Sequence, residues 1–395
     1  MRRYKYARKH TPIIKPSTPN LKHRNIIIAS SIITKILLLV TIFEIFHSFM
    51  DLYDYTLYIQ SVQNILSGTL PWANNVAVFY PPLAFIPMII SYFVSELFNN
   101  GLGFVISMWV FLAVCDIIIT LCIYYIGLKL YSEKTAYVAA LLYATAISVA
   151  YYSLTKYDAF PVCLSMLAIL ATIYGEQTKG YLTSVFGLFA KIWPIILYPF
   201  LWIYNSKVKN NKSHPLGILI LTILFFAGII AFGYNGFLGY TTTVYCNTIA
   251  YLISQYIPVQ LSTLITIFHI LTIAIIFGMM YYLYKQPKSE ILLLKVIFVS
   301  IVAMVLLMQY RSPQYSIWFI PIAALLLATD IWGIILFIGI QVLSFIEFPV
   351  FFWNVYTNTQ YTSPWAPLFF AVFFIMYGIM LWRVWNAERF IRYYD

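Results

Sequence analysis

Two carboxylates and many aromatic residues lie close together in residues 51–82, DLYDYTLYIQSVQNILSGTLPWANNVAVFYPP. A carboxylate is ionised at neutral pH, so Asp54 can act as a general base toward a hydroxyl group. Asp51 lies three residues earlier and shares its face if the segment is helical. Such a pair can raise one of the two pKa values, bind a metal or hold a sugar hydroxyl. The alternative is that both residues only mark the end of a membrane span.

Two cations are candidates for holding a phosphate. Lys191, in FAKIWPIILYP, lies in an apolar run, where a lysine is costly without a partner. Arg311, in QYRSPQYSIW, can hold a phosphate through two parallel hydrogen bonds. The sequence therefore predicts donor-phosphate binding by both. A structural ion pair or a snorkelling side chain is the alternative for Lys191, and a solvated loop cation for Arg311.

The remaining candidates for substrate binding are polar or aromatic residues near these groups. Lys156 and Asp158 (LTKYDAFP) fold over the same site or else form a surface pair, which contributes about 0–1 kcal/mol. The others are Tyr58, Trp72, Tyr80, Gln314 and Tyr315. Their aromatic rings can stack on sugars, although aromatic belts at the membrane interface are the common role. Asp116 and His269 stand alone in apolar runs, and we expect both to make interhelical hydrogen bonds.

No metal or nucleotide site is expected. The four cysteines fit neither a disulfide nor a metal spacing. GxxxxGK[ST], GxGxxG, HExxH and GxSxG patterns are absent from the sequence. An activated donor is therefore expected to be carried by a lipid, with no cofactor and no required metal.

The composition requires a membrane. The chain of 395 residues is 62% hydrophobic and only 9% charged, with a mean hydropathy of +0.83, whereas soluble domains are about a quarter charged. A polytopic all-α membrane protein follows. The net charge of +11 suggests nucleic-acid binding until the basic residues are placed on the topology, where they gather at one membrane face.

The positive-inside rule selects the topology. Residues 1–25 carry eight Lys or Arg and are predicted to form a cytoplasmic tail, so that 26–395 form one membrane domain with a first span at 26–46. The apolar segment 83–98 is short. If it crosses, later basic segments fall outside. If it is re-entrant or juxtamembrane, the only basic residues that fall outside are Lys156, Lys191 and Arg311. The second topology places the N-terminus in the cytoplasm and an extracytoplasmic loop at 47–101.

About 11–13 transmembrane helices are predicted on this topology. Further spans are expected near 102–127, 135–151, 159–175, 214–234, 259–284, 291–309, 316–329, 331–346 and 364–383. Segment 181–204 has cytoplasmic sequence at both ends, so one pass cannot cross. A pair of short helices meeting at Lys191 and Pro194 near the outer face solves this.

Several motifs resemble one family. DYTLYIQSVQNILSGTLPW followed by FYPPLA resembles the first outer loop of GT-C glycosyltransferases. The nearest members are the polyprenyl-phosphate-mannose-dependent mannosyltransferases, including the catalytic subunit of GPI mannosyltransferase I. The matching positions, in order, are Asp54, Tyr58, Gly68, Pro71, Trp72, Tyr80, Pro81 and Pro82. AVCDIIIT, FAKIWPIILYP and SPQYSIW resemble later family signatures, so the resemblance covers residues 51–318.

The resemblance implies a GT-C bundle with juxtamembrane helices in its first extracytoplasmic loop. It implies inverting transfer of a hexose, with mannose favoured, from polyprenyl or dolichyl phosphate to a lipid-linked or glycan acceptor. Asp54 is the implied general base. The GPI enzymes carry Asp-x-Asp, but this chain has Leu52 at the first position, so the role of Asp51 is in doubt. Membrane lipids are expected neighbours, and a small membrane partner subunit is compatible with the family.

A transporter or flippase for a lipid-linked or anionic solute is the alternative. The same cations would form its binding site, and Asp54 would carry protons. The long aromatic loop at one face argues against it, because such transporters bind substrate at the midplane between repeats.

Overall fold

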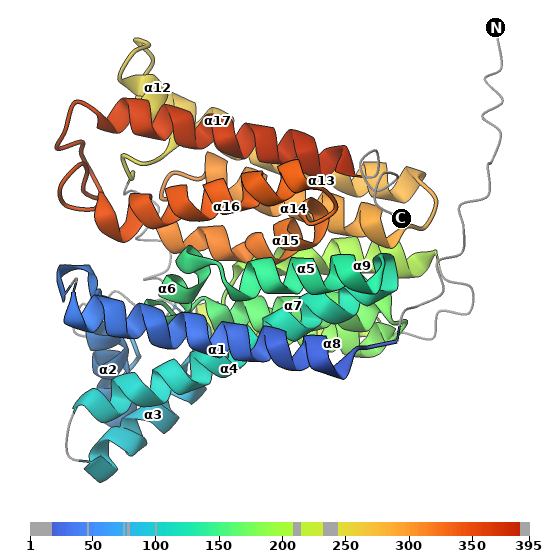
Figure 1. Cartoon of the computed structure of the whole chain (residues 1–395). Helices are drawn as coiled ribbons and strands as arrows, with labels where there is room; N and C mark the ends of the chain where they lie inside the picture. Colours follow the sequence, from blue (N-terminus) through green and yellow to red (C-terminus); the bar gives the residue numbers. More distant parts are fainter. Residues whose placement is uncertain are drawn as a thin grey trace, which may run out of the picture.

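The computed structural model describes residues 18–45, 47–73, 76, 80–98, 101–207, 215–231 and 244–387, and most of these are helical (Figure 1). Most of the predicted cytoplasmic tail lies outside the described residues. The helices are α1 (Leu21–Glu44), α2 (Tyr53–Leu66), α3 (Phe85–Phe98), α4 (Gly101–Leu130), α5 (Glu133–Ala144), α6 (Ile147–Thr155), α7 (Ala159–Ile173), α8 (Gln177–Ala190), α9 (Leu197–Ser206), α10 (Pro215–Ala231), α12 (Ile249–Ser254), α13 (Leu261–Lys285), α14 (Glu290–Leu307), α15 (Ile320–Leu327), α16 (Ile331–Phe345) and α17 (Ala366–Trp385). Short turns are η1 (His47–Phe49), η3 (Pro82–Ala84), η4 (Trp193–Ile196), η6 (Pro313–Trp318) and η7 (Ile346–Val350).

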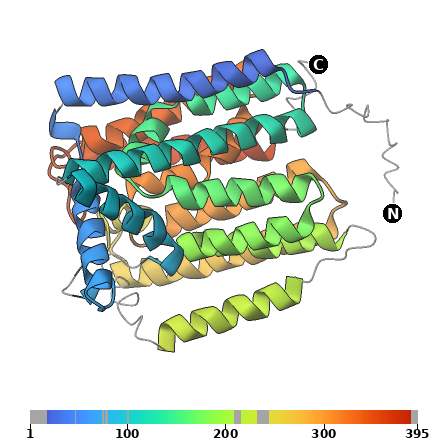
Figure 2. The same cartoon turned by 90° about the horizontal axis from the view of Figure 1, so that it is seen from below.

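The long helices lie side by side with their axes roughly aligned (Figures 1 and 2). Among the described residues, six helices are long and apolar enough to cross a membrane, or seven if the bent pair α5–α6 forms one span. The predicted polytopic, all-α membrane protein is thereby confirmed. The predicted count of about 11–13 spans exceeds this number and would require shorter apolar helices to cross as well.

Two predicted spans have a different shape. Residues 135–151 are interrupted after Ala144, and α5 and α6 are bent by 53°. At the break, the hydroxyl of Thr145 hydrogen-bonds the carbonyl of Leu141 and competes with regular helix geometry. Residues 316–329 hold the end of η6 and the short helix α15. Pro321 lies in the first turn of α15, where its missing N–H is tolerated.

The break predicted within 181–204 is confirmed. Helix α8 ends at Ala190, Lys191 is extended (φ −160°, ψ 150°), and the chain resumes as η4 and α9. Pro194 packs on Gly187, where a Cβ atom would lie 3.2 Å from the proline Cβ. Glycine therefore lets the two arms approach each other.

A buried ion pair joins the first helices of the bundle. Lys35 on α1 pairs with Asp116 on α4, and both side chains are buried. The hydroxyl of Tyr143 also donates to Asp116 at 2.8 Å, and that of Ser153 at 3.2 Å. The predicted interhelical role of Asp116 is confirmed. The same prediction for His269 is wrong among the described residues, because this side chain is exposed on the outlying helix α13.

Helices α2 and α3 lie at one end of the bundle, which we call the α2 end. Helix α2 runs across the bundle axis there, at the left of Figure 1, and α3 runs obliquely beside α4. Helix α3 has 14 residues, which corresponds to about 21 Å and is short of the roughly 30 Å hydrocarbon core. It is thus shorter than a regular membrane span, and that residues 83–98 do not cross stays a prediction.

Candidate functional site

The start of α2 holds both predicted catalytic carboxylates. Asp51 lies two residues before the first residue of α2, and its Oδ1 accepts a hydrogen bond from the backbone N–H of that residue, Tyr53, at 3.0 Å. Asp54 lies in the first turn, where the positive end of the helix dipole favours a negative charge. The sequence therefore places two carboxylates at one helix N-terminus.

One lysine joins these carboxylates. The Nζ atom of Lys156, which follows α6, lies 2.7 Å from Asp51 Oδ2 and 3.1 Å from Asp54 Oδ2. Burial lowers the pKa of Lys156, but Asp54 and Asp51 outweigh it, so the net pKa is raised and the lysine stays charged. These three residues, called the Lys156 triad, carry a net charge of −1.

The two carboxylates of the Lys156 triad differ in what remains available. Both oxygens of Asp51 are engaged, one by the helix terminus and one by Lys156. Asp54 uses only Oδ2, and its Oδ1 has no hydrogen-bond partner among the described residues. The Asp54 side chain is 22% exposed. Asp54 is therefore the carboxylate of the triad that keeps an oxygen available for a further hydrogen bond.

A second ion pair lies in an aromatic cage. Lys191 Nζ is 2.6 Å from Asp158 Oδ1, and the indole N–H of Trp318 donates to the same oxygen at 2.6 Å. The lysine also lies over the rings of Tyr80 and Tyr315, at 5.2 Å from each centroid, and over Trp318 at 5.4 Å. We call these five residues the Lys191 cage. Their contacts stabilise a cation.

Tyr58 connects the two groups. Its ring is 6.0 Å from that of Tyr80, centroid to centroid. Burial raises the pKa of Tyr58 well above its ordinary value, and Tyr80, Asp54 and Asp158 raise it further. The residue thus lies within electrostatic range of both the Lys156 triad and the Lys191 cage, and its hydroxyl stays neutral at any physiological pH.

Lys156 and Asp158 are not the surface pair that their spacing suggests. Both are buried, and each pairs with a residue from another part of the chain. Although they are two residues apart, Lys156 belongs to the Lys156 triad and Asp158 belongs to the Lys191 cage. Tyr157 lies between them in sequence, and its ring stacks on Tyr80 with centroids 5.2 Å apart. Segment 156–158 therefore joins the triad to the cage.

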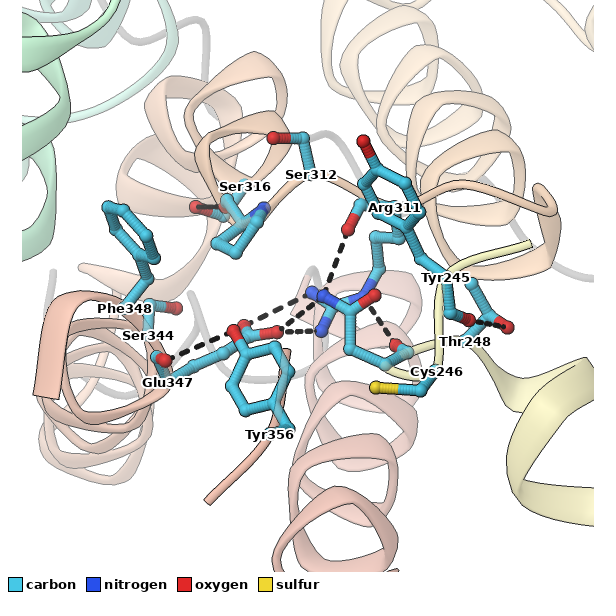
Figure 3. A network of polar contacts seen from close by, with 12 residues as sticks. Tyr245, Cys246, Thr248, Arg311, Ser312, Ser316, Ser344, Glu347, Phe348 and Tyr356 are labelled. Atoms are coloured by element: carbon cyan, nitrogen blue, oxygen red, sulfur yellow. Dashed lines mark hydrogen bonds and ion pairs between the residues drawn. The ribbon is translucent and has the colours of Figure 1, made fainter. Parts of the chain in front are cut away.

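Arg311 is not brought to Lys191. Its buried guanidinium forms an ion pair with Glu347, and its Nε donates to the carbonyl of Asn247 at 3.0 Å (Figure 3). The amide of Asn247 donates in turn to Glu347 at 3.2 Å. Burial lowers the pKa of Arg311, but Glu347 outweighs it, so the net pKa is raised. Arg311 thus anchors loops, and its predicted contact with a donor phosphate has no support in this arrangement.

The other predicted substrate residues differ in position. Tyr80 and Tyr315 belong to the Lys191 cage, as described above. Gln314 is buried in η6, where its side-chain oxygen accepts from the hydroxyl of Ser312. Trp72 is half-buried in the segment after α2, which connects to α2 through the hydrogen bond from Asn64 to the Pro71 carbonyl. Neither contact joins Gln314 or Trp72 to the triad.

Sequence patterns missed three neighbours of the site. Trp318 completes the Lys191 cage, and the ring of Phe348 lies 5.5 Å from Lys156 Nζ. The pKa of Tyr245 is raised by burial and then by Asp54, which places this residue near the triad. Trp318 lies in the SPQYSIW motif, which gave a signal, whereas Tyr245 and Phe348 reach the site only through tertiary packing.

Among the described residues, no three His, Cys, Asp or Glu side chains converge to hold a metal ion. That no metal is required stays a prediction. No family model matches the sequence, and no curated protein matches it. The arrangement of the Lys156 triad and the Lys191 cage is thus the basis on which a function is assigned.

Proposed function

We propose that this protein is an integral-membrane glycosyltransferase that moves a hexose, with mannose favoured, from polyprenyl or dolichyl phosphate to a lipid-linked or glycan acceptor. One observation carries the proposal. Asp54, a carboxylate with a free oxygen, and Lys191, a cation surrounded by aromatic rings, belong to one connected group of side chains. A base, a cation and stacking surfaces are what sugar transfer from a phosphate requires.

In the proposed reaction, Asp54 Oδ1 takes the proton of the acceptor hydroxyl as that oxygen attacks the anomeric carbon. The bond from this carbon to the phosphate oxygen breaks, its electron pair stays with the polyprenyl phosphate, and the configuration inverts. Lys156 holds the other oxygen of Asp54 and so orients the base.

Lys191 is the cation proposed for the leaving phosphate. An ammonium group has three N–H donors, and one of them is directed at Asp158. The others face the rings of Tyr80, Tyr315 and Trp318 and can turn to a phosphate oxygen. The pairing with Asp158 makes this site less cationic than the sequence suggests. The donor must therefore gain affinity from its sugar and lipid parts as well.

Labelled donor tests the proposal. Membranes that contain the chain, and matched membranes without it, receive polyprenyl-phosphate mannose labelled in the sugar together with a lipid extract of the host. Transfer of label to a new lipid or glycan only with the chain is the expected result, and a glucose donor is tried in parallel. Uptake of intact donor into sealed vesicles, with no transfer from either donor, would instead establish the transporter alternative.

A further inference from the structure

An apolar groove runs along α1 toward the end of the bundle that holds the Lys156 triad. It has a volume of about 520 Å³ and is lined by Thr34, Leu37, Leu38, Thr41, Ile42, Phe49, Thr145, Ile147, Phe345 and Val350. The α1 residues recur at helical spacing and form one stripe. In Figure 1, α6 lies between α1 and α16 and packs on both. The groove thus runs between α1 and α16, beside α6.

The walls of the groove suit a hydrocarbon chain. Thr41 and Thr145 each hydrogen-bond a carbonyl of their own helix, at 2.7 and 2.8 Å, so these hydroxyls need no polar ligand. Leu37 is 61% exposed and marks the side that opens to the surroundings of α1. The volume of the groove lies within the range of about 300–1,000 Å³ that is usual for ligand pockets.

The Phe49 end of the groove lies close to the triad. Phe49 precedes Asp51 by two residues, and its carbonyl accepts a hydrogen bond from Tyr151 at 2.6 Å. The ring of Tyr151 contacts both Phe345, which lines the groove, and Phe348, whose ring touches Lys156. A chain seated in the groove with its head group at this end therefore brings the head group near the triad.

Charge decides which lipid fits. The triad carries one net negative charge, which repels a phosphate head group. The paired cation Lys191 belongs to the separate cage with Asp158. We infer that the groove between α1 and α16 holds the hydrocarbon chain of a neutral, hydroxyl-bearing lipid, which is the acceptor of the reaction. This inference rests on the proposed function and assigns the acceptor to one side of the site.

Photolabelling tests the inference without requiring turnover. The purified full chain in nanodiscs is exposed to a dodecyl glucoside that carries a diazirine at the end of its chain, and to a dodecyl phosphate with the same diazirine. The neutral probe is expected to label groove residues, and the anionic probe to label them about tenfold less. Thr34→Trp and Thr145→Trp fill the groove from opposite walls and displace about two methylene groups, so each should lower labelling about tenfold.

Ile33→Trp is the matched control, because Ile33 is exposed on α1 and is not part of the groove lining. Equal labelling by both probes, or equal labelling of the Thr34, Thr145 and Ile33 variants, would overturn the inference. Fluorescence-detected gel filtration confirms that each variant is folded. Loss of groove labelling with sugar transfer intact refutes only the groove. Specific labelling without any transfer activity refutes the glycosyltransferase proposal.

Discussion

Asp54→Asn should abolish most sugar transfer, whereas Asp51→Asn should leave most of it. Asparagine at position 54 keeps the shape and one oxygen toward Lys156 but cannot accept a proton. A positioned general base contributes about 10²–10⁴-fold, which corresponds to about 3–5 kcal/mol of activation free energy. The kcat of Asp54→Asn should fall by that factor, with little change in the KM for the donor.

Asp51 has a different role in the same triad. The side-chain oxygen of asparagine can accept the same hydrogen bond, so the bond from the Tyr53 N–H is retained in Asp51→Asn. The ion pair with Lys156 becomes a hydrogen bond from the charged ammonium to a neutral amide oxygen, a difference of about 1 kcal/mol before screening at this partly exposed site. We expect a small loss of stability and a kcat within about tenfold of the wild type, or about 1.4 kcal/mol.

Both variants are purified and compared at saturating donor, and their thermal unfolding midpoints confirm folding. The assignment of the base is refuted if folded Asp51→Asn loses as much kcat as Asp54→Asn. It is also refuted if Asp54→Asn remains as active as Asp51→Asn.

Three further predictions concern the ion pairs. Glu347→Gln leaves Arg311 buried without its counter-charge and should lower the free energy of unfolding by about 3–5 kcal/mol. The control Glu176→Gln removes an exposed pair and should change the free energy of unfolding little. Equal denaturation midpoints for the two variants would contradict this prediction. The raised pKa of Lys156 means that its pairing is fully present below its ordinary pKa of 10.5 and is lost as pH rises through the raised value. Lys156→Gln should therefore lower the free energy of unfolding by the same amount at about pH 7 and about pH 9, and by less above about pH 10.5. A loss of stability that is already smaller at about pH 9 than at about pH 7 would argue against the pairing. Lys191→Met should destabilise the protein, because it leaves Asp158 without its counter-charge. Adding Asp158→Asn should restore stability but not sugar transfer. Recovery of sugar transfer in the double variant would exclude Lys191 from phosphate binding.

Charge placement predicted part of the fold. The broken segment at Lys191 follows from basic sequence at both of its ends, and the shortness of α3 is readable from its apolar length. The bend after Ala144 was missed, because one continuous apolar run gives the same pattern whether the helix is straight or broken. Periodicity records which residues are apolar and does not record where packing interrupts the axis.

The sequence predicted most of the residues of the site but not which of them form ion pairs with each other. Asp54, Lys191, Tyr80 and Tyr315 are found in one connected group, because each stood out by its type in an apolar chain. Arg311 also stood out, yet it pairs with Glu347, 36 residues away. The free-energy cost of a charged side chain within a membrane indicates that a buried charge has a partner. It does not say whether that partner is a substrate or another side chain.

A structure determined by electron cryomicroscopy with bound polyprenyl-phosphonate mannose, a donor that cannot react, tests the central claim most directly. The phosphonate is expected within hydrogen-bond distance of Lys191 Nζ, with the sugar against Tyr80 and Tyr315 and its anomeric carbon facing Asp54. Density for the analogue along the buried pair of Lys35 and Asp116, away from Asp54, would contradict the account and favour a path across the membrane.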